Sequence, residues 1–380
     1  MNAVHAWITV VAGLAQYLLH RLHLAPKPDL MHARAEFCTV IGHIWGWRKR
    51  LRVVHGERCP RDMPCVFAQN HVFLLDPFVS FGAAMQSAGI LPRFMSRDDF
   101  FAEKKQSWWY RLVNVDELIC QLGTLEISRG NVSIGQLRPF VNVLRNGESF
   151  IMYPGRTRSR SGLIFEYRGE VQEPGSASFF LAQAQRGRET DLDVAIVPLT
   201  RTRNVATGID TVLVGHPLRL APRAGREEQR ALDFQLVEAI AQNVTVNATQ
   251  LAAGILYLHA LHGLEESIGR GGFEAMARAA LERVNGRYID PDARADLPGQ
   301  VSAGMRHFRK AGLVALSRDS IRLDRAKILA TPPMDGTFRK LNPVKYSLNQ
   351  VLHFADVTQA IEDVVLTPRA QCAGGAEQLP

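Results

Sequence analysis

The stretch FAQNHVFLLDPF, residues 67–78, places a histidine and a carboxylate five positions apart at a predicted strand-to-helix junction. The preceding run PCVFAQ, residues 64–69, is apolar and rich in strand-forming residues. Asp76 and the proline after it are typical of a helix start, where aspartate caps the first turn and proline takes the first helical position. We therefore expect His71 to lie in the turn between the two elements and to face a cleft.

The pair of His71 and Asp76 suits removal of a proton from a weakly acidic hydroxyl. A neutral imidazole can accept that proton, while a nearby carboxylate fixes the tautomer and stabilises the imidazolium that forms. The substrate would supply the attacking hydroxyl, because the chain has no Gly-x-Ser-x-Gly pattern for a serine nucleophile. The alternative is structural: Asp76 caps a helix and His71 is an ordinary turn histidine.

Three further stretches follow this one in order. Residues 123–130, GTLEISRG, are a short apolar strand pattern that ends at Arg129. Residues 150–162, FIMYPGRTRSRSG, are an apolar run followed by an arginine-rich loop. Residues 194–199, VAIVPL, are an apolar strand interrupted by Pro198. If all three are strands of one sheet, the polar residues after them converge at the carboxyl ends of the strands.

Together the four stretches resemble the ordered sequence blocks of the glycerolipid acyltransferase family, over about 130 residues. The resemblance implies transfer of a fatty acyl group from acyl-CoA or acyl carrier protein to the hydroxyl of glycerol 3-phosphate or 1-acylglycerol 3-phosphate. It implies His71 as general base and Asp76 as the group that holds it, with no metal and no bound cofactor. The substrate-binding residues that it implies are Asn70, Arg129, Arg156, Thr157, Arg158, Ser159 and Pro198.

The third block departs from the family pattern, which reads Phe-Pro-Glu-Gly-Thr-Arg-Ser. This chain has Gly155 and Arg156 where the family has Glu and Gly. A carboxylate that normally helps to hold the acceptor is therefore missing, and the identity of the acceptor stays open. The departure also favours the alternative of a catalytically silent lipid-binding or membrane-docking protein that keeps the fold.

Arginine and hydroxyl residues alternate over residues 156–161. In an extended segment a period of two places the arginines on one side and the hydroxyls on the other. A phosphate-bearing acceptor would meet charge-assisted hydrogen bonds there. The alternative is a solvated basic loop, with contact to RNA as a variant.

The composition is that of a globular protein of 380 residues with a formal net charge of +8. The charge favours an anionic partner: a phospholipid surface, acyl carrier protein or coenzyme A, rather than nucleic acid once the family resemblance is considered. The five cysteines show no Cys-x-x-Cys pair or metal-ligand spacing, which indicates reduced thiols in a cytoplasmic setting.

Residues 51–220 alternate between strand and helix patterns, which predicts an α/β domain whose sheet is flanked by helices. His71, Arg129 and the loop 154–162 each follow a predicted strand end. The expected strands are 51–54, 65–68, 93–96, 125–127, 150–153, 195–199 and 212–214, and the expected helices lie near 77–88, 98–106, 133–145 and 176–187.

Residues 1–50 are predicted to form an N-terminal helical hairpin that associates with a membrane. Residues 3–19 carry no charged side chain but are short for a spanning helix. They do not read as a signal peptide, because the first residues lack Lys and Arg and no small-residue cleavage site stands out. Residues 31–47 form a second helical pattern with two tryptophans, followed by the basic cluster 48–50. We expect a peripheral or monotopic position at the cytoplasmic face; the alternative is a hairpin that simply packs on the domain.

Residues 221–370 are predicted to be mainly helical, followed by a frayed tail at 371–380. The stretch KYSLNQVLHF, residues 345–354, is loosely similar to a motif in the helical region that follows the catalytic domain of glycerol-3-phosphate acyltransferases. A winged-helix module at 300–324 is the alternative. Helices are expected at 227–242, 243–263, 273–284, 301–311 and 346–365, with a hairpin at 312–316 and 320–323.

Overall fold

A computed structural model describes residues 3–44, 46, 50–73, 76–97, 108, 113–127, 134–155, 158–166, 174–186, 193–331 and 341–373. At its centre is a seven-stranded mixed sheet with the order β1-β7-β6-β2-β5-β3-β4. All pairings in this sheet are parallel except that of β6 with β7. The strands are β1 (Leu51–Val54), β2 (Cys65–Gln69), β3 (Arg93–Arg97), β4 (Leu125–Ile127), β5 (Phe150–Met152), β6 (Ala195–Arg203) and β7 (Asp210–Val214).

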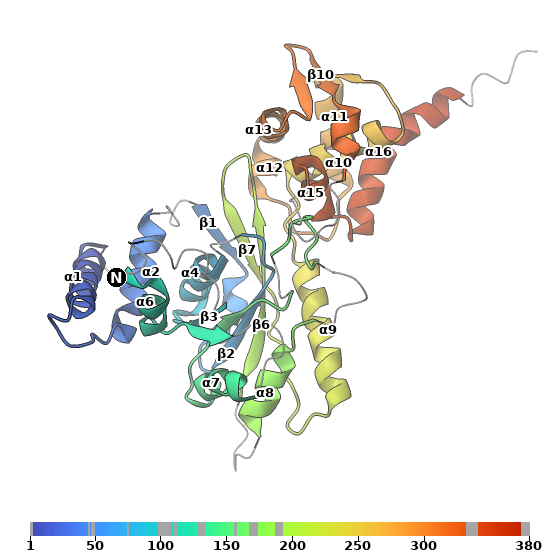
Figure 1. Ribbon diagram of the computed structural model, residues 1–380. Helices are drawn as coiled ribbons and strands as arrows, with labels where there is room; N and C mark the ends of the chain where they lie inside the picture. The colour runs from blue at the N-terminus through green and yellow to red at the C-terminus, as the bar shows by residue number, and fades with distance from the viewer. Residues whose placement is uncertain are drawn as a thin grey trace, which may run out of the picture.

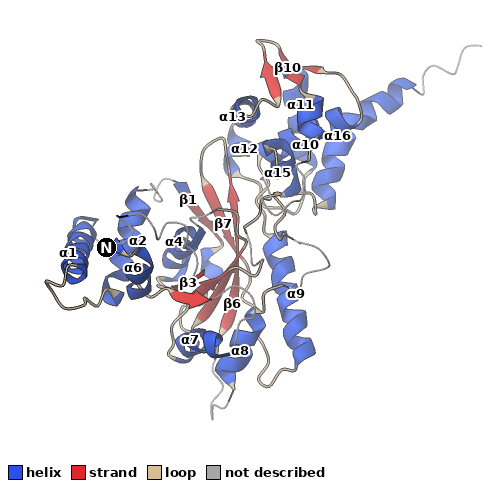
Figure 2. Cartoon of the chain, in the orientation of Figure 1, coloured by secondary structure: helices blue, strands red, loops and turns tan. Residues whose placement is uncertain are grey.

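Helices cover both faces of this sheet, as Figure 2 shows. Because side chains alternate along a strand, Val66 and Ala68 of β2 face one core and Phe67 faces the other. The first core is closed by α7 (Ile134–Arg145), α8 (Ala177–Gln185) and α9 (Arg226–Gln242), and the second by α4 (Asp76–Ala88). The predicted α/β class with a helix-flanked sheet is confirmed.

The N-terminal helices α1 (Ala3–Arg21) and α2 (Arg34–Ile44) pack against each other and against α6 (Val115–Gln121), to one side of the sheet (Figure 1). The hydroxyl of Tyr17 in α1 donates to the carbonyl of Asn114 at 3.0 Å, which ties the hairpin to the domain. Helix α1 is long and apolar enough to cross a membrane by length and composition. Its outer face stays apolar and exposed, with Val4, Trp7, Ile8 and Val11 among the exposed side chains.

The C-terminal helices lie beyond the upper end of β6 and β7 in Figure 1 and surround a helix, α10 (Ala248–Leu261), that is almost entirely buried. The hairpin of β9 (Val314–Leu316) and β10 (Ser320–Leu323) is present as predicted, and β8 (Ser267–Gly269) pairs with β10 as a third strand. Three helices lie between β8 and this hairpin, one more than the helix–strand–helix–helix–hairpin order of a simple winged-helix module. The remaining helices are α11 (Arg270–Arg283), α12 (Pro291–Ala295), α13 (Leu297–Lys310), α14 (Arg325–Leu329), α15 (Pro343–Asn349) and α16 (Ala355–Ala373).

Three details differ from the sequence-based expectations. The predicted helix 346–365 is two helices, α15 and α16, because the chain turns at 350–354 and buries Phe354. Strand β6 continues four residues beyond the predicted end, to Arg203, because it pairs along its polar half with β7. Helix α6 was not predicted, and the helix expected near 98–106 falls outside the described residues.

Candidate active site

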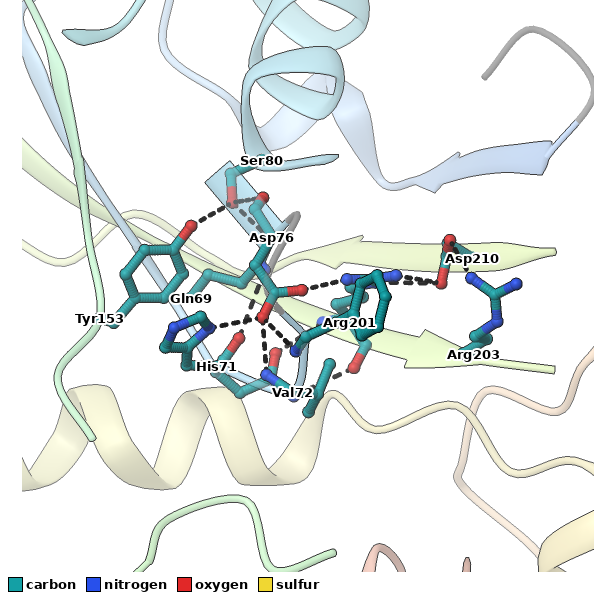
Figure 3. A network of polar contacts seen from close by, with 11 residues as sticks. Gln69, His71, Val72, Asp76, Ser80, Tyr153, Arg201, Arg203 and Asp210 are labelled. Carbon is teal, nitrogen blue, oxygen red and sulfur yellow. Dashed lines mark hydrogen bonds and ion pairs between the residues drawn. The ribbon is translucent and has the colours of Figure 1, made fainter. Parts of the chain in front are cut away.

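The turn between β2 and α4 brings His71 against the carboxylate of Asp76, at the start of α4. The Nδ1 atom of His71 lies 2.7 Å from Oδ2 of Asp76 (Figure 3). The same carboxylate oxygen accepts the backbone N–H groups of Val72 at 2.6 Å and Phe73 at 2.8 Å. Asp76 is fully buried, whereas the His71 side chain is 20% exposed. The carboxylate therefore shapes the turn and is itself shielded from solvent.

This contact fixes the state of the imidazole. An ionised carboxylate can only accept hydrogen bonds, so Nδ1 of His71 carries a proton, and in the neutral ring Nε2 is the nitrogen with the lone pair. Among the described residues no group hydrogen-bonds Nε2. One face of the ring stacks on Tyr153, with centroids 4.4 Å apart and planes 26° from parallel. Position and tautomer are thus both set by neighbours, and the free nitrogen can accept a proton.

Tyr153 follows β5, and its uncharged phenol ring packs against the imidazole of His71. Its hydroxyl lies 3.5 Å from the Ser80 hydroxyl, which in turn donates to Oε1 of Gln69 at 2.8 Å. Burial, reinforced by the negative charge of Asp76, raises the pKa of Tyr153 well above its ordinary value. Tyr153 therefore keeps its proton over the working range of pH.

Arg201 of β6 is a residue of this site that the sequence interpretation missed. Its guanidinium donates to Oδ1 of Asp76 and, from Nε at 3.0 Å and Nη2 at 2.8 Å, to Oδ1 of Asp210 on β7 (Figure 3). It is almost fully buried. The segment TRTR that ends β6 looks like a polar loop, and only its pairing with β7 shows that Arg201 points inward.

The charges of this network hold each other in the ionised form. Burial alone would raise the pKa of Asp76, but the hydrogen bond from His71 and the charge of Arg201 outweigh it and leave that pKa below its ordinary value. Burial alone would lower the pKa of Arg201, but Asp76 and Asp210 raise it. Asp76 is therefore a carboxylate at neutral pH, as an orienting partner of histidine must be.

The predicted substrate-binding residue Asn70 makes two hydrogen bonds to the backbone of Arg201. Its Nδ2 donates to the carbonyl of Arg201 at 3.0 Å, and its Oδ1 accepts the N–H of Arg201 at 2.8 Å. Both polar groups of this buried side chain are therefore used to attach the His71 turn to β6. Pro198 is also buried in β6 and packs against Gly215. A Cβ added at position 215 would lie 3.0 Å from the Cβ of Pro198.

The arginine-rich loop lies directly beside His71. The N–H of Ser159 donates to the carbonyl of His71 at 2.7 Å, and the Ser159 hydroxyl accepts the N–H of Gly162 at 3.0 Å. Arg158 is exposed next to this contact. The predicted residues Arg129, Arg156 and Thr157 fall outside the described residues.

The same loop is held from its other side by the C-terminal helices. Asn349 of α15 donates to the carbonyl of Ser161 at 2.8 Å, and the N–H of Leu341 donates to the carbonyl of Arg160 at 2.9 Å. Gly162 has φ +93° and lies so close to α15 that a Cβ would overlap the carbonyl oxygen of Tyr346. A side chain at position 162 is therefore excluded both by conformation and by contact.

A carboxylate inside the loop completes this arrangement. Glu166 is buried and accepts the N–H groups of Arg160 at 2.5 Å and Ser161 at 2.7 Å, and the hydroxyl of Ser161 at 2.8 Å. The third sequence block lacks its usual glutamate, and Glu166 places a carboxylate on the backbone of the same loop. Over the described part of the chain, no three or more His, Cys, Asp or Glu side chains are grouped as metal ligands.

Comparison with known proteins agrees with this geometry. A family model described as Acyltransferase matches residues 50–201, the segment that holds His71, Asp76, the arginine-rich loop and Arg201. The matched segment contains all four sequence blocks, and the match confirms the resemblance to acyltransferases that they indicate.

Among solved structures, the chain is similar to the 1-acyl-sn-glycerophosphate (LPA) acyltransferase PlsC from Thermotoga maritima. The sequence identity is 17% and the TM-score 0.38, over 62% of this chain and 91% of that one. No curated protein sequence matches the chain significantly.

Proposed function

We propose that the chain is a membrane-associated O-acyltransferase that moves a fatty acyl group from a thioester, acyl-CoA or acyl carrier protein, to the hydroxyl of a glycerol-phosphate acceptor. The acceptor class is glycerol 3-phosphate or 1-acylglycerol 3-phosphate. The observation that carries the proposal is the contact of 2.7 Å between His71 and a buried, ionised Asp76, which leaves Nε2 of His71 as a proton acceptor inside an acyltransferase-family segment.

The residues of the site support a mechanism in which His71 acts as general base. Nε2 takes the proton of the acceptor hydroxyl as its oxygen attacks the thioester carbonyl, and Asp76 stabilises the imidazolium. Collapse of the tetrahedral adduct breaks the carbon–sulfur bond, and the thiolate leaves with the electron pair. In this mechanism Arg158, which is exposed beside the His71 turn, neutralises the acceptor phosphate together with Arg129 and Arg156.

The first test is transfer of a labelled acyl group by the purified protein to glycerol 3-phosphate and to lysophosphatidate, in parallel. We expect labelled lipid with one of these acceptors, and the faster one identifies the physiological class. Binding of labelled lipid without any transfer, with both acceptors and with both thioester carriers, would instead support the silent lipid-binding alternative.

We further propose that α1 attaches the enzyme to the cytoplasmic face of a phospholipid membrane. The inner side of α1 is buried against α2, while Trp7, Ile8 and Val11 on its outer side are 42%, 63% and 59% exposed. An exposed apolar helix face of this kind is typical of helices that lie in a membrane interface. The net charge of +8 favours an anionic surface.

Replacement of Ile8 and Val11 by aspartate is expected to move the protein from the liposome pellet to the supernatant. The reason is that two carboxylates would have to enter the apolar boundary, whereas the packed side of α1 is unchanged. The measurement is co-sedimentation with anionic liposomes, and the control is the double variant Leu261→Asp/Leu352→Asp, which adds the same charge at exposed leucines of the C-terminal region. Equal pelleting of the α1 variant and wild type would contradict the role of α1.

A further inference from the structure

A cavity of about 710 Å³ lies between the central sheet and the C-terminal helices. Val72 and Phe73, the two residues after His71, form one wall, and Tyr346 and Gln350 of the C-terminal region form the opposite one. His71 itself does not line the cavity. The cavity lies next to the turn that carries His71 and does not enclose the imidazole. The arginine-rich loop contacts the His71 turn separately, through Ser159. The cavity and the arginine-rich loop therefore both contact the turn that carries His71.

Basic side chains gather on the wall of this cavity. Arg50 and Arg203 line it from the sheet side and His307 of α13 from the C-terminal side. Arg203 is 47% exposed and shares Asp210 with Arg201, at 3.3 Å from Nη1 to Oδ2. Guanidinium groups in this position suit a phosphate group, which they contact by charge-assisted hydrogen bonds.

The wall formed by the C-terminal helices presents carboxamides. Oδ1 of Asn247 caps α10 by accepting the N–H groups of Thr249 and Gln250, and Oε1 of Gln350 accepts Nε2 of Gln250 at 2.9 Å. The acceptor atoms of Asn247 and Gln350 are thereby used. Their NH₂ groups have no acceptor among the described residues, and both side chains line the cavity. They are available to donate to carbonyl oxygens of a ligand.

We propose that this cavity binds the phosphopantetheine arm of the acyl thioester donor. Such an arm carries two amide carbonyls between the thioester sulfur and a terminal phosphate. Placed in the cavity, it meets the carboxamides of Asn247 and Gln350, reaches the arginine side chains with its phosphate, and presents the thioester at Val72 and Phe73, next to His71. This assignment rests on the proposed acyl transfer, and it holds for coenzyme A and for a carrier protein because both carry the same arm.

The test uses donors of decreasing length with two variants. Gln350→Leu removes one donor to the arm and is expected to raise the KM for acyl-CoA and for acyl-pantetheine about fivefold, the effect of one hydrogen bond. Arg203→Met is expected to raise the KM for acyl-CoA but not for acyl-pantetheine, which has no phosphate. Neither variant should change the KM for the acceptor. Acyl carrier protein, assayed beside acyl-CoA, identifies the natural source of the arm.

Gln359→Leu, at an exposed glutamine of α16 away from the cavity, is the matched control, and thermal unfolding verifies that each variant is folded. An unchanged donor KM in Gln350→Leu, or a raised acceptor KM instead, would overturn the assignment. Calorimetric titration with coenzyme A supplies a readout without turnover: both variants should bind it more weakly than wild type, and equal binding would count against the cavity. Failure of wild type to transfer acyl groups at all would refute the proposed function instead.

Discussion

Replacing His71 by alanine is expected to lower the turnover number for acyl transfer by about 10²–10⁴-fold, the contribution of a positioned general base. The reason is that His71 is the group beside the arginine-rich loop whose free nitrogen can take the acceptor proton. The fold should survive, because Asp76 keeps its hydrogen bonds to the backbone of Val72 and Phe73 and its ion pair with Arg201. The measurement is the initial rate with saturating donor and acceptor.

Two comparisons make this result specific to His71. His262→Ala removes an exposed histidine at the end of α10 and should leave the rate unchanged. Thermal unfolding and liposome sedimentation of His71→Ala should match wild type. If a folded His71→Ala protein retains a tenth of the wild-type turnover, His71 is not the base.

Replacing Arg201 by methionine is expected to destabilise the protein by about 3–5 kcal/mol and to abolish most activity. Removal of one member of a buried ion pair leaves the partner charge without compensation, which is the costly case for buried salt bridges. Here two carboxylates lose their shared cation at once, those of Asp76 and Asp210. The measurements are the free energy of unfolding in urea and the turnover of the fraction that remains folded.

The matched control is Arg219→Met, which removes an exposed ion pair with Asp193 and should cost less than about 1 kcal/mol. Arg201→Lys separates charge from geometry: it keeps the cation but loses the forked contact, and we expect intermediate stability. A change of less than 1 kcal/mol in Arg201→Met would show that the buried network is not what holds Asp76 in place.

In an acid titration, Arg201→Met should unfold at a higher pH than wild type. The pKa of Asp76 in the folded protein lies below its unfolded value of about 3.9. Its carboxylate therefore stabilises the fold above that pH, and the contribution is lost as pH falls through the lower folded pKa. Without Arg201 the folded pKa rises, so the loss begins at higher pH. Circular dichroism against pH measures this shift.

The sequence was informative where local pattern decides structure. All seven strands of the sheet lie where apolar runs and turn residues predict them, and the cap at Asp76 predicts both the start of α4 and the position of His71 beside it. These features depend on residues close together in the chain. Side-chain alternation and capping act over such distances, so no tertiary information was needed.

The missed parts of the site depend on contacts between distant segments. Arg201 looks like a polar loop residue until β7 supplies Asp210 and the His71 turn supplies Asp76. Asn349 lies in a loosely recognised stretch, and its hydrogen bond to Ser161 joins residues 188 positions apart. Asn70 was assigned to substrate because of its place in the motif, whereas its amide is bound to the backbone of β6. Polarity alone does not show which partner a side chain finds.

The most direct test of the mechanism is the rate at which wild type and His71→Ala, assayed side by side, form labelled lipid from a labelled acyl thioester and a phosphorylated glycerol acceptor. The contact of 2.7 Å between His71 and Asp76 predicts product from wild type at a rate about 10²–10⁴-fold higher than that of the folded variant. Equal rates of product formation by both proteins, or no product from either, would contradict it.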